Sequence, residues 1–328
     1  MTYNDYVFKL LLELSASNNF SVKGFSQNYI IEVSNNKDKF YIYGNCFPLN
    51  DASSQKLCAD KSALSMVLKL NDVNCLEHEL YKNPDYDPTF NINLIENKLK
   101  ENPKGLVLKD NKGYCGNNVF WVKNKTQIKK AVNKIFKQNL DLAVCPYVDI
   151  EDEFRLIMLN GECKVCYKKV RPYVIGDGKL NVKNLIAKKY KDIKFDLPFK
   201  TLNTTPNKNE KIVLGWKHNL KWHSTPEEVV DKKLEKKLIE FAKKVVKTIN
   251  LKFCSVDLYV EDNKIKVLET NSIVSMNSFA NYSKENYNKT KQIFLEAVNA
   301  SFNNISTIWS IILYWKKFCE ILTNVINK

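Results

Sequence analysis

The sequence predicts an α+β fold in which helices alternate with antiparallel hairpins. Three observations support this fold class. In segment 229–250, apolar residues recur at every third or fourth position, as they do in an amphipathic helix. Segment 154–170 divides at Asn160-Gly161, the strongest short-range signal for a hairpin turn. Segment 256–272 consists of two alternating runs around a short polar stretch, the pattern of a second hairpin.

The other elements follow in chain order from periodicity and turn residues. Helices are predicted over 3–17, 56–71, 94–102 and 126–139. Strands are predicted over 29–34, 39–44, 105–110, 119–124 and 142–149. A polar linker is expected at 50–55, and loops at 85–93 and in the lysine- and asparagine-rich region 188–210.

Length and charge limit the classes of partner. A chain of 328 residues can bury a substantial core divided among two or three lobes. The 51 Lys and Arg against 36 Asp and Glu give a net charge of +15, which favours anionic partners such as nucleotides, phosphates, nucleic acid or acidic lipid. Lys and Asn are enriched along the whole chain, and there is no arginine-rich arm, zinc finger or RNA-binding strand pattern. We therefore expect no specific binding of nucleic acid.

Nine cysteines are scattered singly, and no signal peptide is recognisable, which indicates reduced thiols and a cytoplasmic location. Cys163 and Cys166 point to opposite faces of a predicted strand, so a zinc site is not expected there. The three histidines have no metal-ligand spacing, and each is expected to be a solvated loop residue: His78, His218 and His223.

The C-terminal run 306–317 is apolar around much of a helix but far shorter than the roughly 20 residues of a membrane span. No transmembrane segment is therefore expected. We expect a helix that packs on the rest of the chain, with a dimer contact or an interfacial membrane helix as the alternatives.

Strand parity places Asp257, Glu269 and Asn271 on one face of the hairpin 256–272. A loop with an odd number of residues centred near Asn263 would place Asp257 directly opposite Glu269. Two carboxylates and an amide oxygen are ligands that magnesium accepts. Taken alone, a solvated polar face explains the pattern better than a metal site does.

A second motif joins Lys109, at the end of a predicted strand, to a turn that contains Gly113 and Gly116. Backbone amides in such a turn can approach phosphate oxygens closely because glycine has no Cβ, and an inward lysine adds positive charge. The stretch has neither the Walker A sequence nor G-x-G-x-x-G spacing, so an ordinary turn is the alternative.

The motifs stand in a specific order: Asp60-Lys61 at a helix start, the strand lysine with its glycine loop, Glu153-x-Arg155, Gly176-Asp177-Gly178, and Asp257 followed by Glu269-x-Asn271. This order resembles that of the ATP-grasp superfamily over about residues 50–300. The stretch VIGDGKLNVKNLI, 174–186, is similar to the ATP-grasp segment of cyanophycin synthetase and of the glutathione-synthetase half of fused glutathione-making enzymes.

The resemblance implies two α+β lobes that grip ATP, with antiparallel sheets. It divides the chain into a short N-terminal lobe over 1–57, an ATP-grasp domain over 58–300 and a C-terminal apolar helix over 301–328. Within the ATP-grasp domain, the lid would cover about 90–148 and the catalytic lobe about 149–300.

The resemblance also implies an ADP-forming carboxylate–amine ligase with ATP and Mg²⁺ or Mn²⁺ as cofactors. The substrates would be small molecules: an amino acid or peptide carboxylate and an amine. Residues on ATP would be Lys61 and Lys109 at the phosphates, Gly113 and Gly116 in a mobile lid, Cys145, Tyr147 and Val148 at the adenine, and Glu153. The metal ligands would be Asp257, Glu269 and Asn271. The catalytic residues would be Arg155, Lys169 and Arg171.

The sequence departs from the family pattern at positions that bear on the chemistry. Lys169 stands where the family has an arginine, so the charge is kept but the bidentate fork is lost. Gly215 replaces a second arginine, and Lys221–Ser224 replaces a run of small residues. Either Arg171 or Lys217 supplies the missing charge, or the chemistry has changed. A degenerate ATP-grasp protein that binds nucleotide and a partner without turnover is therefore the alternative; substrate identity and homo-oligomer formation stay open.

Overall fold

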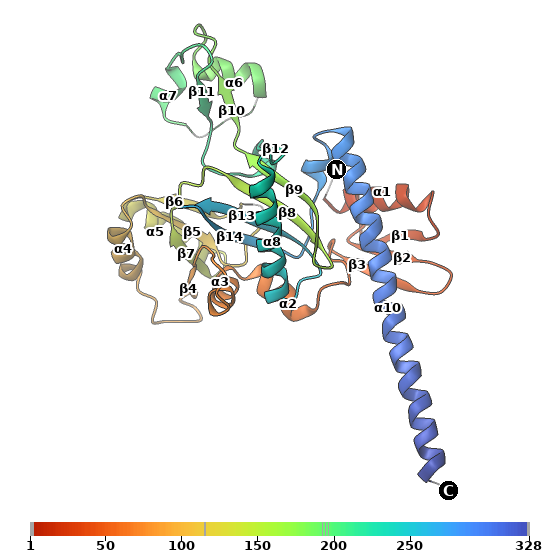
Figure 1. Cartoon of the computed structure of the whole chain (residues 1–328). Helices are drawn as coiled ribbons and strands as arrows, with labels where there is room; N and C mark the ends of the chain where they lie inside the picture. The colour runs from red at the N-terminus through yellow and green to blue at the C-terminus, as the bar shows by residue number, and fades with distance from the viewer. Residues whose placement is uncertain (1–2, 115, 192, 194, 196, 327–328) are drawn as a thin grey trace.

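The computed structural model describes residues 3–114, 116–191, 193, 195 and 197–326, and for residues 3, 4 and 306–326 it describes the backbone only. Figure 1 shows three lobes and a small projecting unit. The predicted α+β class is confirmed, because the sheets pair in antiparallel register and helices cover them.

The N-terminal lobe is a three-stranded sheet packed on one helix of its own and on the long helix at the other end of the chain. It contains α1 (Tyr3–Ser15), β1 (Ser21–Phe25), β2 (Ile30–Ser34) and β3 (Lys39–Tyr43). Alternation along β3 buries Phe40 and Ile42 and exposes Tyr41 and Tyr43, so one face of the sheet meets the core and the other meets solvent. The predicted helix and the two predicted strands are confirmed, whereas β1 was not predicted.

A four-stranded lobe follows, with strand order β4-β7-β5-β6. Its elements are β4 (Glu79–Tyr81), α4 (Ile92–Glu101), β5 (Leu106–Asp110), β6 (Val119–Val122), α5 (Lys125–Phe136) and β7 (Leu142–Pro146). Leu106 and Leu108 belong to the core that the strands share with α4 and α5. Because side chains alternate along a strand, Val107 and Lys109 point to the opposite face of the sheet.

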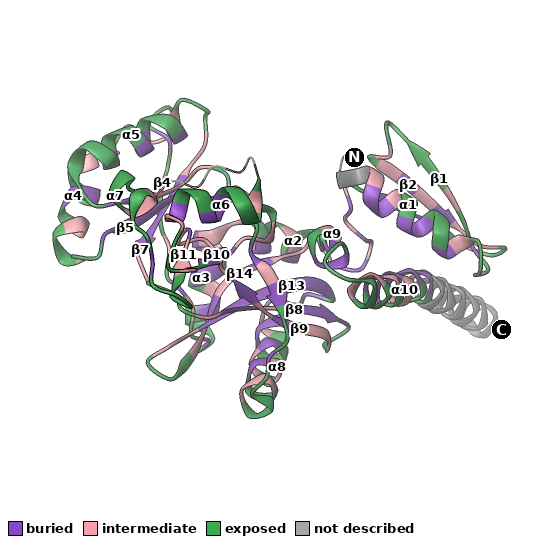
Figure 2. Ribbon diagram, turned by 90° about the horizontal axis from the view of Figure 1, so that it is seen from above, coloured by how far each residue is buried: buried purple, intermediate pink, exposed green. Residues whose placement is uncertain are grey.

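The largest sheet has five strands in the order β12-β9-β8-β13-β14. They are β8 (Glu153–Leu159), β9 (Glu162–Val170), β12 (Thr225–Glu227), β13 (Phe253–Glu261) and β14 (Lys264–Asn271). One face packs on α2 (Ala52–Ala59), α3 (Lys61–Leu70) and α8 (Lys232–Thr248). In Figure 2, β8 and β13 are coloured as buried along most of their length.

The single helix predicted over 56–71 is wrong in one respect, since the chain forms two helices that meet at Asp60. Asp60 has extended backbone angles (φ −100°, ψ 105°), ends α2 and caps α3. Its Oδ1 accepts a hydrogen bond from the backbone N–H of Ala63 at 3.0 Å. The cap turns the chain, and Lys61 becomes the first residue of α3. The linker predicted at 50–55 is also partly helical, because α2 begins at Ala52.

Region 188–210 contains helical structure, so the prediction of a loop there is wrong. β10 (Tyr173–Ile175), α6 (Val182–Tyr190), α7 (Phe199–Asn203) and β11 (Lys211–Val213) form the projecting unit at the top of Figure 1. Its small core includes Leu185, Ile186 and Leu214, with Phe195 and Leu197 packed against it. Apolar residues spaced among the lysines therefore provide a core that the composition of the region concealed.

The chain ends in α9 (Asn277–Ala280) and α10 (Lys284–Ile326). A separate helix is predicted over 301–328, but residues 301–326 are the continuation of α10, a helix of 43 residues; residues 327–328 lie outside the described residues. The first part of α10 packs on the N-terminal lobe, where the ring of Phe302 lies 4.9 Å from that of Phe40. The expected packing of 306–317 concerns side chains outside the described residues. Over the residues the structure describes, no helix has the length and apolar character that a membrane crossing needs.

Candidate active site

The hairpin β13–β14 places Asp257 directly opposite Glu269, as the sequence predicts, and Asn271 opposite Ser255. The condition of an odd-numbered loop is not met. The turn has two residues, Asp262 and Asn263, both with positive φ. A β-bulge restores the predicted pairing, because Leu258 pairs with Val267 and Asp257 with Glu269.

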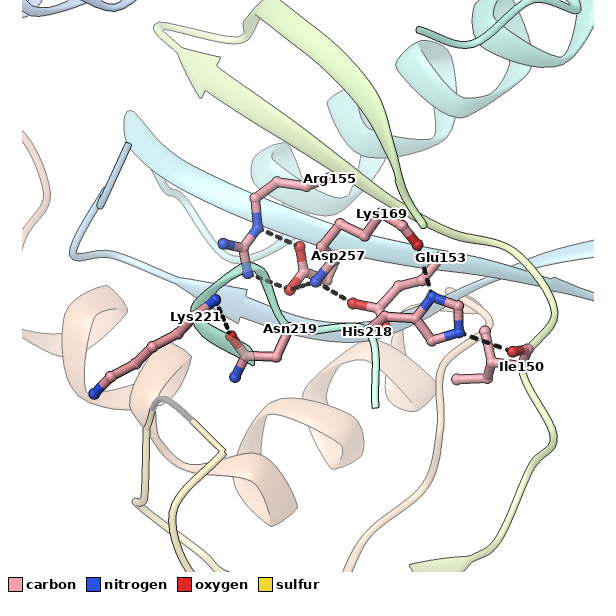
Figure 3. A network of polar contacts seen from close by, with 8 residues as sticks. All are labelled: Ile150, Glu153, Arg155, Lys169, His218, Asn219, Lys221 and Asp257. Carbon is pink, nitrogen blue, oxygen red and sulfur yellow. Dashed lines mark hydrogen bonds and ion pairs between the residues drawn. The ribbon is translucent and has the colours of Figure 1, made fainter. Parts of the chain in front are cut away.

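Asp257 is fully buried and accepts three charge-assisted hydrogen bonds (Figure 3). Arg155 donates from Nε to Oδ1 at 2.7 Å and from Nη2 to Oδ2 at 2.6 Å. Lys169 Nζ donates to Oδ2 at 2.9 Å. Burial alone would raise the pKa of Asp257, but Arg155 and Lys169 outweigh it and hold that pKa well below its usual range. Asp257 is therefore ionised and fixed in place.

Glu153 lies beside this pair and shares Lys169 with Asp257 through a second ion pair. Burial raises the pKa of Glu153 to about 7, Lys169 opposes the shift and the charge of Asp257 adds to it. Register explains the grouping: Arg155 is opposite Asp257 across β8 and β13, and Glu153 is opposite Lys169 across β8 and β9. Three strands thus gather two carboxylates and two cations.

Two lysines approach from the other side of the site. Lys61, at the start of α3, donates from Nζ to the carbonyl oxygens of Gly113 at 2.6 Å and Asp110 at 3.2 Å. Burial lowers the pKa of Lys61, the charge of Glu269 opposes this shift and that of Lys109 adds to it. Among the described residues, neither lysine has a carboxylate oxygen within 4.0 Å. Lys61, on which the charge of Glu269 acts, and Lys109 are therefore cations without a carboxylate partner in the described part of the chain.

An apolar cluster joins the four-stranded sheet to β13 and β14. Its buried members are Leu76, Val107, Cys145 and Tyr259, and its partly buried members include Tyr147, Val148, Trp216 and Leu268. Tyr259 is two residues from Asp257 on the same face of β13, about 7 Å along the strand. One sheet face thus passes from apolar to strongly charged, with the lysines opposite.

Solved structures share this arrangement of sheets. The bifunctional glutathione synthetase from Pasteurella multocida superposes with a TM-score of 0.53 and 17% identity, over 88% of this chain and 43% of that one. The D-alanine–D-alanine ligase from Bacillus anthracis gives a TM-score of 0.54 at 13% identity, over 77% of this chain and 70% of that one. This chain has the ATP-grasp fold.

A third ATP-grasp structure agrees with these two. The D-alanine–D-alanine ligase from Coxiella burnetii has a TM-score of 0.54 at 14% identity, over 83% of this chain and 64% of that one. The chain spans less than half the length of the bifunctional glutathione synthetase. No protein-family model matches the sequence, and no curated protein matches it either.

The residues predicted at the adenine lie where the four-stranded sheet meets β13 and β14. The side chain of Cys145 lies in the apolar cluster. The ring of Tyr147 stacks on that of Trp121, with 3.9 Å between the ring centroids. The backbone N–H of Tyr147 donates to the carbonyl of Gly105 at 3.0 Å, which fixes the chain at the exit of β7. Val148 packs on the same cluster.

Residues 216–219, here called the bridging loop, contact both the four-stranded sheet and the five-stranded sheet. Trp216 packs in the apolar cluster, and Lys217 Nζ donates to the carbonyls of Val119 at 3.2 Å and Gly116 at 3.4 Å. Arg171 instead lies 3.6 Å from Asp149. Of the two cations considered for the missing charge, Lys217 is the one that contacts the glycine loop.

The bridging loop also contains a buried histidine that sequence reasoning missed. The ring of His218 lies between two backbone carbonyls, with Nδ1 2.7 Å from Lys169 O and Nε2 2.9 Å from Ile150 O (Figure 3). Burial lowers the pKa of His218, and the two carbonyls oppose that shift. The ring of His78 is also buried. The prediction of solvated loop histidines is therefore wrong for both; their apolar neighbours Trp216 and Leu76 were the available signal.

Proposed function

We propose that the protein is an ADP-forming ligase that joins a carboxylate to an amine with ATP and magnesium. The observation that carries this proposal is the face of β13 and β14, on which an apolar cluster is followed by Asp257 and Glu269, opposite Lys61 and Lys109. An adenine base suits the apolar end, and a metal-bound triphosphate suits the charged end. The structures cited above include glutathione synthetase and D-alanine–D-alanine ligases, which supports the same reaction class.

The nucleotide is proposed to lie between the two sheets. The adenine would pack on Tyr147, Val148 and the Cys145 end of β7, while the phosphates would extend toward Lys61 and Lys109. Gly113 and Gly116 would let the loop 111–118 cover the phosphates closely, since a Cβ at Gly116 would strain a backbone with φ +72°.

The hairpin residues fit a magnesium ion. Glu269 and Asn271 are half-buried and would direct oxygen atoms at the ion. Asp257 is fully buried, and both of its oxygens accept hydrogen bonds from Arg155 or Lys169, so it would support the site from behind. Within the described residues, no three His, Cys, Asp or Glu side chains form a complete site. The protein would therefore supply part of the shell, and phosphate oxygens and water would supply the rest. Bound there, magnesium would neutralise charge on the transferred phosphoryl group.

The reaction has two steps. A carboxylate oxygen of the substrate attacks the γ-phosphorus, the bond to the β-phosphate oxygen breaks, and ADP leaves. The amine nitrogen then attacks the acyl carbon, phosphate leaves, and the nitrogen loses a proton to solvent as the amide forms.

The cations around Asp257 have separate roles in this scheme. Arg155 uses two of its five donors on Asp257 and can direct others at the acyl phosphate. Lys169 is occupied by Asp257 and Glu153, so it positions both carboxylates. We retain Arg171 as a catalytic candidate, with its guanidinium beside Asp149.

The test is ADP release from Mg-ATP with and without pools of amino acids and small peptides, with Glu269→Gln as control. We expect pool-dependent ADP formation that the variant loses, and deconvolution of the active pool would then name the substrates. Turnover that survives in Glu269→Gln would overturn the assigned metal site.

A second candidate is a protein that binds nucleotide and a partner without turnover. The contacts of Lys217 with the carbonyls of Gly116 and Val119 favour this second function. They hold the glycine loop, which would cover the phosphates, against the bridging loop and so limit its movement. The exposed Trp222, in place of a small residue, is a further difference from a ligase loop. Tight binding of Mg-ATP with no ADP release from any pool would support this function instead.

A further inference from the structure

His78 is a half-buried side chain whose Nδ1 is fully buried, and the reaction above gives it no role. It lies between α3 and β4, and its backbone N–H donates to Ser65 Oγ at 3.1 Å. The preceding segment is fixed to β14, because the N–H of Leu76 donates to Val267 O at 2.8 Å and the N–H of Val267 donates to Asn74 O at 2.9 Å. The imidazole is thus held by two elements that line the candidate site.

The partner of the imidazole fixes its tautomer. His78 Nε2 lies 3.2 Å from Lys109 Nζ. An ammonium group can only donate, so Nε2 accepts and the single ring proton is on Nδ1. Burial, followed by the charges of Lys109 and Lys61, lowers the pKa of His78 well below its ordinary value, in keeping with a neutral ring.

The other ring nitrogen shows why this residue is unusual. Nδ1 is buried and has no hydrogen-bond partner among the described residues. A buried donor without an acceptor is unfavourable, and an apolar side chain of similar size would avoid that penalty. The hydrogen bond that the structure does give this ring is the one between Nε2 and Lys109 Nζ.

A neutral acceptor has a specific consequence for the lysine. Many lysines of this chain pair with carboxylates, as Lys98 does with Glu79 and Lys125 with Glu96, which cancels their charge. The imidazole instead accepts a hydrogen bond from one N–H group of the Lys109 ammonium. This bond orients the other two N–H groups and leaves the positive charge of the lysine intact. Such a lysine is suited to a ligand with several negative charges.

We propose that His78 is a positioning residue that aims Lys109 at the phosphate groups of a nucleotide without neutralising it. This inference rests on the proposed nucleotide site, but it does not require ligase turnover. It assigns His78 to phosphate affinity and leaves recognition of the adenine to the apolar cluster.

The experiment compares His78→Gln, His78→Leu and His78→Glu with the wild-type chain. Glutamine offers a neutral acceptor, leucine removes the acceptor, and glutamate offers an acceptor whose charge cancels that of Lys109. Binding of Mg-ATP and of adenosine is measured by titration calorimetry, and the steady-state KM for ATP is compared with kcat where turnover is present.

We expect the leucine and glutamate variants to bind Mg-ATP about tenfold more weakly and the glutamine variant to stay within about threefold of the wild type. Adenosine should bind all four proteins equally, and any change in turnover should lie in KM and not in kcat. A purely structural role would lower adenosine affinity in parallel.

The proposal is overturned if the leucine variant binds Mg-ATP as the wild type does, if glutamine fails to rescue, if adenosine binding falls equally, or if the wild type binds no Mg-ATP. Wild-type binding with the expected variant pattern but no ADP release from any pool would support the role of His78 and remove the ligase.

Discussion

Asp257 and Glu269 are directly paired across β13 and β14, yet their surroundings differ sharply. Asp257 has no exposed surface and carries the hydrogen bonds of Arg155 and Lys169. Glu269 is half-buried, and within the described part of the chain it has no Lys, Arg or His nitrogen within 4.0 Å. The same hairpin thus presents one carboxylate that holds the network together and one that is free for a ligand.

Replacing Glu269 with glutamine is expected to reduce magnesium-dependent ADP release by about 100-fold or more, because a metal-facing charge is lost. The free energy of unfolding should change by less than about 1 kcal/mol, since no ion pair is broken. ADP release across a magnesium titration, with a urea unfolding curve, measures both quantities. A large loss of stability would show that Glu269 has a structural partner.

Replacing Asp257 with asparagine should, in contrast to Glu269→Gln, lower the free energy of unfolding strongly. It leaves two buried cations facing a neutral amide, and breaking such a pair typically costs about 3–5 kcal/mol. Urea unfolding at pH 7 measures the loss, with Glu269→Gln as the matched control from the facing position. Equal stability of the two variants would contradict the assigned network.

The free energy of unfolding should depend on Glu153 between about pH 4.5 and 7. The folded chain retains the proton of Glu153 up to about pH 7, whereas the unfolded chain releases it near 4.5. Stability contributed by this residue therefore falls as pH rises through that window, by at most about 3 kcal/mol. The difference in unfolding free energy between the wild type and Glu153→Gln should change across this window and be constant below and above it. A constant difference from pH 4 to 8 would show that the pKa is not raised.

Replacing Lys217 with methionine should loosen the glycine loop, because two hydrogen bonds to its carbonyls are lost. We expect faster tryptic cleavage after the exposed Lys112 and about threefold to tenfold weaker binding of Mg-ATP. Lys221→Met is the matched control, since Lys221 is exposed on the adjacent turn. The same cleavage rate in both variants would argue against a tie between the lobes.

Sequence reasoning was most accurate where alternation determines the result. Parity alone placed Asp257, Glu269 and Asn271 on one face, and the register agrees. The pairing of Asp257 with Glu269 was conditional on an odd loop, and the structure reaches the same register with a two-residue turn and a bulge. Bulges have weak sequence signals, so pairing can be predicted more reliably than the path that produces it.

Elements whose core is formed by residues distant in sequence were harder to predict. The ring of His78 contacts Lys109, which is 31 residues away in the sequence, so local periodicity gave no signal for this contact. Periodicity alone predicted one helix through Asp60, and only the family motif of Asp60-Lys61 at a helix start indicated the cap that the structure has. In the projecting unit, the lysine content suggested a loop, although Tyr190 and Phe195 supply a small core.

The N-terminal lobe is completed by a helix from the far end of the chain. Tyr6 and Phe40 share one core with Phe294 and Phe302 of α10, so these contacts close a loop of about 250 residues. Such long closures form slowly compared with local hairpins. During synthesis the strands of the site, which end at Asn271, are therefore available to pair before α10 emerges. The N-terminal lobe, although synthesised before α10, is consequently among the last parts of the chain to find its final partners.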